Sequence, residues 1–90
     1  MSVSIEEELL ESIEIYPNPV SQNLFITSPT VKMTHIRLVN LTGQVLSQQA
    51  FDKNNASNQA QIAMQDLTPG IYWVLVQTEF GLRQEKVVKF

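Results

Sequence analysis

One stretch of this 90-residue sequence decides its fold: Leu67-Thr68-Pro69-Gly70-Ile71-Tyr72-Trp73-Val74-Leu75-Val76. Pro69-Gly70 favours a tight turn, and the six apolar residues that follow are typical of a central strand buried on both faces. Tyr72, just after the turn, indicates a tyrosine corner, in which the hydroxyl bonds back to that turn. Because successive side chains of a strand alternate, Tyr72 and Trp73 are expected on opposite faces. Six apolar residues are far fewer than the roughly 20 that a membrane helix needs.

Short β-type runs lie on both sides of this stretch, separated by turn residues. The expected strands cover residues 13–16, 24–27, 35–41, 44–51, 60–64, 71–78 and 82–90. Pro17 and Pro19 end the first strand because they cannot donate ladder hydrogen bonds, and Thr42-Gly43 predicts a hairpin. About seven short strands with regular turn signals predict an all-β fold, an antiparallel immunoglobulin-like β-sandwich. An open barrel is the second possibility.

The first twelve residues differ from the rest in charge. Five of the nine acidic residues fall within the first fourteen positions. This run favours a solvated acidic linker, or a remnant of an upstream protein, over residues 1–12, ahead of a domain over residues 13–90. A short helix near residues 5–11 is the alternative, because Ser4 and Glu7 form a capping box and an apolar residue recurs every four positions.

With no basic start and no long apolar stretch, this N-terminus is not expected to be a signal peptide. The protein is therefore either not exported or a fragment whose export signal lay upstream.

The composition argues against several kinds of site. Without cysteine the chain has no disulfide, no thiolate nucleophile and no cysteine-bound metal. The single histidine, His35, excludes a histidine-pair metal site, and a net charge of −3 argues against nucleic acid as the main partner. The three glycines are isolated, so no loop is suited to cradle phosphate. We therefore predict no cofactor and no metal.

A catalytic centre is not predicted either. A Ser or Thr nucleophile needs a base, and His35 is expected on the surface, opposite the face that carries Ile36 and Leu38. The carboxylates of the domain are few and scattered, and Asp66 is more simply a turn residue. The chain is therefore not expected to be an enzyme.

Taken in order, a set of short motifs resembles the type A C-terminal sorting domain of proteins carried by the type IX (Por) secretion system. The resemblance covers residues 13–90. No single motif is specific for this family, but their combination in this order is. These motifs are Ile15-Tyr16-Pro17-Asn18-Pro19-Val20, Asn23-Leu24, Ile36-Arg37-Leu38, Gly43-Gln44-Val45, Leu67-Thr68-Pro69-Gly70-Ile71-Tyr72, Gly81 and Lys86-Val87-Val88-Lys89.

The resemblance implies a secretion signal at the end of a larger cargo protein of a Gram-negative bacterium. An N-terminal signal peptide would take the parent to the periplasm, and outer-membrane machinery would then recognise this domain. A sortase-like protease would cut upstream, here within residues 1–12, and the cargo would be released or anchored at the cell surface. In isolation the domain is expected to be a monomer or a weak dimer.

The resemblance also implies a set of recognition residues. They are Pro17, Asn18, Pro19, Gly43, Leu67, Gly70, Tyr72, Gly81, Lys86 and Lys89. Phe90, where the sequence departs from the family pattern, is a further candidate. Lys86 and Lys89 are three apart on the last strand and are therefore expected on opposite sides, one facing the machinery. That strand is expected at a sheet edge, where unpaired backbone groups can bind a partner. The sequence ends on Phe90, which would place a carboxylate beside Lys89 as a candidate contact.

Two other functions stay open from the residues alone. The first is an accessory β-sandwich that binds glycans or a cell surface, in which an exposed aromatic ring such as that of Trp73 serves as the ligand platform. The second is a structural spacer without a specific partner, which leaves the terminal motif unexplained.

Overall fold

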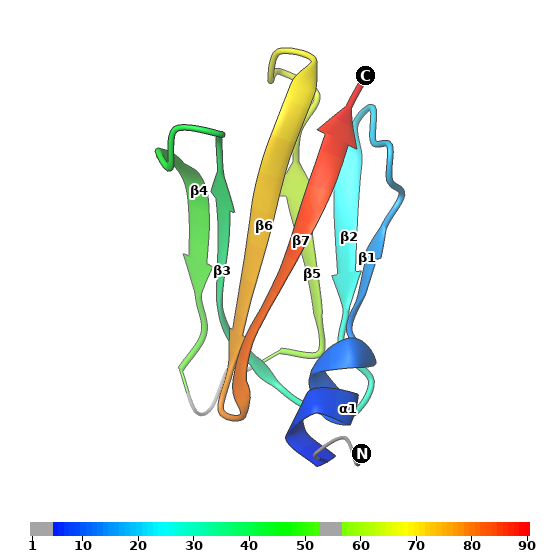
Figure 1. The fold of residues 1–90 in the computed structure, drawn as a ribbon, viewed down its shortest axis with the longest axis vertical. Helices are drawn as coiled ribbons and strands as arrows, with labels where there is room; N and C mark the ends of the chain where they lie inside the picture. Colours follow the sequence, from blue (N-terminus) through cyan, green and yellow to red (C-terminus); the bar gives the residue numbers. More distant parts are fainter. Residues whose placement is uncertain (1–4, 53–56) are drawn as a thin grey trace.

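In a computed structural model, described over residues 5–52 and 57–90, the chain forms two antiparallel sheets (Figure 1). The three-stranded sheet has the order β1-β2-β5, with β1 (Glu14–Tyr16), β2 (Asn23–Thr27) and β5 (Gln59–Ala63). The four-stranded sheet has the order β4-β3-β6-β7, with β3 (Met33–Val39), β4 (Val45–Ala50), β6 (Gly70–Thr78) and β7 (Gly81–Lys89). The predicted all-β sandwich is confirmed.

Each described strand lies within two residues of its predicted bounds. The largest shift concerns β3, which ends at Val39 because Asn40 closes the following turn. The Asn40 Oδ1 accepts hydrogen bonds from the main-chain N–H groups of Thr42 (3.1 Å) and Gln44 (2.9 Å). Gly43 completes this turn with a φ of 88°, in the left-handed region that glycine adopts most readily.

The core lies between the two sheets and is built from alternate residues of the strands. Its fully buried members include Leu24, Ile26, Met33, Ile36, Leu38, Met64, Val74, Val76 and Val87. Along β6 the inward residues are buried, whereas Ile71 is exposed and Trp73 is half-buried. The prediction that this strand is buried on both faces is wrong. A sandwich has only two layers, so one face of each sheet meets solvent.

The tyrosine corner predicted at Tyr72 is present. The ring is buried, and its hydroxyl donates a hydrogen bond to the main-chain oxygen of Thr68 at 2.5 Å. This bond fixes the turn before β6 to the first residues of the strand, at the end of the sandwich where the chain ends (Figure 1).

The acidic N-terminal segment contains a helix, α1 (Ile5–Glu11), as in the helical alternative. Leu9 and Leu10 are half-buried and pack against the core, which supports a helix too short to be stable in water by itself. Leu10 also lies beside the β6–β7 turn, since a Cβ at Gly81 would stand 3.3 Å from its Cδ1. The predicted capping residue Ser4 lies outside the described residues. The interpretation of residues 1–12 as a linker stays a prediction.

Candidate functional site

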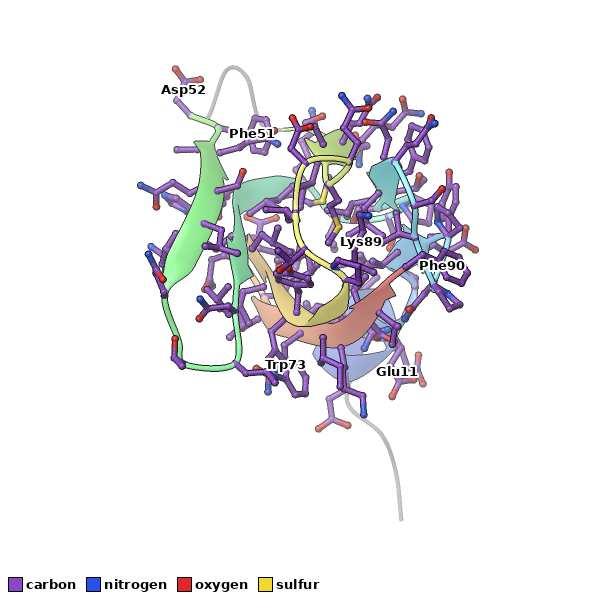
Figure 2. All side chains as sticks on the ribbon, turned by 90° about the horizontal axis from the view of Figure 1, so that it is seen from above. Glu11, Phe51, Asp52, Trp73, Lys89 and Phe90 are labelled. Atoms are coloured by element: carbon purple, nitrogen blue, oxygen red, sulfur yellow. The ribbon has the colours of Figure 1, made fainter. Side chains whose placement is uncertain are left out.

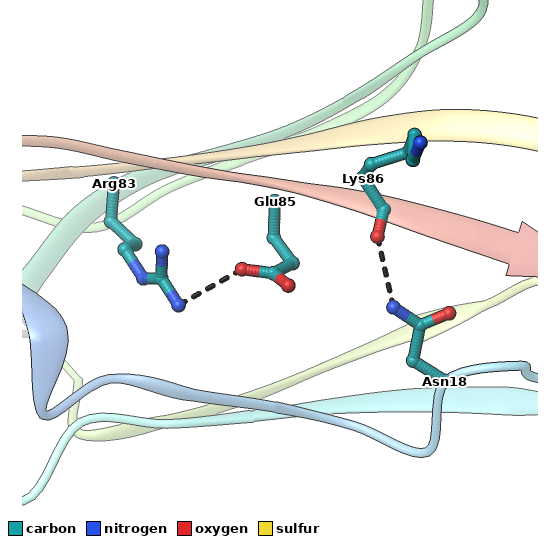
Figure 3. Close-up of polar contacts among 4 residues, drawn as sticks. All are labelled: Asn18, Arg83, Glu85 and Lys86. Atoms are coloured by element: carbon teal, nitrogen blue, oxygen red, sulfur yellow. Dashed lines mark hydrogen bonds and ion pairs between the residues drawn. The ribbon is translucent and has the colours of Figure 1, made fainter.

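Two motifs that lie far apart in the sequence meet at the last strand. The side chain of Asn18, in the segment between β1 and β2, donates a hydrogen bond to the main-chain oxygen of Lys86 at 2.9 Å (Figure 3). Its Oδ1 accepts a hydrogen bond from the Val88 N–H at 3.0 Å. Two residues later, the N–H of Val20 donates to the Val88 oxygen (2.8 Å), and the Val20 oxygen accepts from the Phe90 N–H (3.0 Å).

The local sequence explains this arrangement. Pro17 and Pro19 have no N–H group, so the segment cannot continue β1 as a ladder-forming strand. The Asn18 side-chain amide donates one hydrogen bond and accepts another, as a peptide group would, and so takes the place of a peptide group opposite β7. Three main-chain groups on the outer edge of β7, and the N–H of Phe90 directly after it, are bonded by Asn18 and Val20.

The expectation that the last strand lies at a sheet edge is confirmed, because β7 is the last strand in the order β4-β3-β6-β7. The expectation that the end of this edge offers unpaired backbone groups needs correction. Between Lys86 and Phe90 the segment from Pro17 to Val20 already covers the edge, which protects it from pairing with another chain. A partner that binds at this end must therefore contact side chains or displace the segment.

The two lysines face opposite sides of β7, as predicted. Lys86 is exposed on the outer face of the sheet, whereas Lys89 is 8% exposed and points inward (Figure 2). The Lys89 Nζ donates a hydrogen bond to the main-chain oxygen of Phe90 at 2.9 Å. Of the two lysines, Lys86 is therefore the one that is exposed to solvent.

Most of the predicted recognition residues gather at this end of the sandwich. Gly70 is paired in register with Lys89, Tyr72 is paired with Val87, and Leu67 lies in the turn that precedes β6. Two glycines lie elsewhere. Gly43 is in the β3–β4 turn across the sheet, and Gly81 is the first residue of β7, at the opposite end (Figure 1).

The structure adds Val20 to the site. Its side chain is fully buried, and it forms a parallel bridge with Lys89. In the sequence Val20 is the last residue of the first motif, Ile15–Val20, but its residue type alone does not predict its contact with the last strand.

The structure also places the histidine that the sequence offers as a possible base. His35 is exposed, and its Nδ1 lies 3.3 Å from the hydroxyl oxygen of the neighbouring Thr34. In residues 5–52 and 57–90 no three His, Asp or Glu side chains are placed to hold a metal ion. No helix in this part of the chain is both long and apolar enough to cross a membrane.

Replacement of Asn18 by alanine tests the contact between the two motifs. Asn18→Ala removes both hydrogen bonds to β7, and we expect the free energy of unfolding to fall by about 1–2 kcal/mol, since each bond contributes about 0.5–1.5 kcal/mol. The measurement is urea unfolding followed by the fluorescence of Trp73. As a control, Gln48→Ala alters an exposed residue of β4 and should change this free energy by less than about 0.5 kcal/mol. Equal midpoints for Asn18→Ala and the wild type would contradict the contact.

Comparison with known protein families gives one match that spans the sandwich. The model of the family described as the secretion system C-terminal sorting domain matches residues 14–89. The match runs from β1 to β7 and leaves α1 outside. No curated protein matches the chain.

Proposed function

The chain belongs to the secretion system C-terminal sorting domain family, and on that premise we propose that the secretion machinery recognises it at the C-terminal half of β7, through Lys86. The domain is a C-terminal sorting signal for type IX secretion. This function implies an upstream cargo, the secretion machinery as partner, and export to the cell surface or the medium. The family is not known for catalysis.

The observation that carries the proposed recognition site is the contact between β7 and the segment from Pro17 to Val20, which we call the Asn18 segment. It holds the strand end in one position through four hydrogen bonds, so Lys86 is presented from a fixed backbone. A binding surface held by packed elements loses less conformational freedom when the partner binds. The other gathered motif residues, Gly70 and Tyr72 among them, support the same strand end from β6.

The finer steps of the pathway belong to the same proposal. The parent protein passes through the periplasm, and a sortase-like protease cuts within residues 1–12, upstream of the sorting domain over residues 13–90. The separated domain is a monomer or a weak dimer. Covering of the β7 edge by the Asn18 segment supports this state, because it removes one edge from pairing between copies.

The alternative function, a glycan-binding or surface-binding module, is not favoured. The rings of Tyr16 and Phe25 do stack on the outer face of the three-stranded sheet, with centroids 5.9 Å apart. Stacked aromatic pairs of this kind also stabilise a sheet across neighbouring strands, which accounts for the pair without a ligand.

Reversal of the charge at Lys86 tests the proposed recognition site. In a cargo fusion that ends with residues 1–90, Lys86→Glu is expected to lower export about tenfold, which corresponds to about 1.4 kcal/mol of lost interaction with the machinery. Lys32→Glu is the matched control, because Lys32 is an exposed lysine between β2 and β3 and the charge change is the same. Export is measured as the share of fusion protein outside the cells. The site is wrong if both variants are exported equally.

A further inference from the structure

The outer face of the four-stranded sheet carries a contiguous apolar patch. Trp73 lies at its centre, on the side of β6 that faces away from the other sheet (Figure 2). In register, Trp73 has Val39 as its neighbour on β3 and Lys86 on β7. Val45 of β4 extends this row beyond Val39, so that one row of side chains crosses all four strands. The residues at the two ends of this row, Val45 and Lys86, are both exposed, and the exposed fraction of Val45 is 48%.

Further apolar residues widen the patch along the strands. Ile71 and Val88 are paired across β6 and β7 and are 39% and 38% exposed. Leu75 lies two residues after Trp73 on the same face and is half-buried. Large side chains of a monomer seldom gather on one exposed face unless something covers them.

The charges on this face have one sign. Arg37 and Lys86 are exposed there, and Arg37 is paired in register with Leu75. None of the outward-pointing strand positions of this sheet is Asp or Glu, although the whole chain has a net charge of −3. Within the described residues the one ion pair, Arg83 with Glu85 at 2.9 Å, involves neither of the outward cations (Figure 3).

We propose that this face, centred on Trp73 and bounded by Arg37 and Lys86, is a docking surface for an acidic protein partner. The partner presents an apolar patch with carboxylates at its rim. The inference rests on the proposed function and names the chemistry of the machinery component that reads the signal. Tryptophan and arginine are the residues that most often anchor protein interfaces, and opposite charges at the rim fix the orientation of the partner.

Two other occupants fit the face less well. A second copy of this chain would bring Arg37 and Lys86 of each copy toward the same cations of the other, and such like charges repel. An anionic membrane is held by clusters of about four to eight Lys or Arg residues, whereas this face has two and the whole chain is acidic.

The test compares Arg37→Glu with Lys32→Glu, the exposed lysine outside the face. Both variants reverse one surface charge, and both should keep the wild-type unfolding midpoint. The probe is the detergent-solubilised outer-membrane secretion complex from a competent host, and its affinity for residues 1–90 is measured at low and high salt. We expect Arg37→Glu to weaken binding about tenfold and to reduce the salt dependence, while Lys32→Glu changes neither.

The possible outcomes separate this inference from the proposed function. Normal export of the wild-type fusion together with equal affinities for Arg37→Glu and Lys32→Glu overturns the docking surface and leaves the proposed function standing. Binding of the wild type to anionic phosphatidylserine vesicles but not to the complex assigns the face to a membrane and overturns the inference. If sedimentation shows that the wild type is a dimer and that Arg37→Glu is a monomer, the face is assigned to a second copy of the chain. That result also overturns the inference. No export of the wild-type fusion overturns the proposed function and this inference together.

Discussion

Deletion of Lys86–Phe90 from a cargo fusion is expected to lower export to the level of a fusion that has no sorting domain. The deletion removes the exposed Lys86, which we propose as a contact of the machinery, and the partners of Asn18 and Val20 on β7. It therefore removes both the side chain and the backbone that presents it. The measurement is the share of fusion protein outside the cells.

The same deletion is expected to destabilise the sorting domain itself. Val87 is fully buried, and burial of such a side chain contributes about 1.5–3 kcal/mol. Bonds of Val20 to β7 are lost as well. A domain of this length has a total stability of about 5–13 kcal/mol, so the loss is a large fraction of it. The cargo, which folds by itself, should stay folded.

Two variants separate loss of the signal from loss of the fold. Lys86→Glu changes an exposed side chain and keeps Val87 in the core, so it should impair export at an unchanged unfolding midpoint. Deletion of Phe90 alone leaves all of β7 in place and removes one main-chain bond to Val20. Normal export of the fusion that lacks Lys86–Phe90 would contradict the assignment of the signal to the strand end.

Local patterns carried most of the fold prediction. Alternation of apolar and polar residues in β3, and the turn residues on either side of β6 and before β7, are signals local in sequence, and they placed these three strands within two residues of their bounds. Tyr72 and Thr68 are four residues apart, so their hydrogen bond could be predicted from the turn between them. The opposite directions of Lys86 and Lys89 likewise follow from the two-residue period of a strand.

The remaining features depend on contacts that no local pattern records. Asn18 contacts β7 nearly seventy residues later in the sequence, where its amide replaces a peptide group. The residue type alone does not predict this role. The exposed face of β6 is as apolar as its buried face, so the pattern alone predicted burial of both. Helix α1 is stabilised by Leu9 and Leu10 against the core, and those contacts exist only once the sandwich has formed.

The most direct test of a sorting function is the export of a fluorescent protein that is targeted to the periplasm and carries residues 1–90 at its C-terminus. The fusion is expressed in a bacterium with the type IX system and in a mutant that lacks the outer-membrane pore. Recognition by the machinery predicts fluorescent protein outside the competent cells and none outside the mutant. Removal of residues 13–90 from the exported protein would add support for the proposed cut.

The fold of the fusion is checked beforehand by its unfolding transition, so that a negative result can be interpreted. Retention of the intact, folded fusion in the periplasm of both strains would contradict the assignment of this domain as a sorting signal.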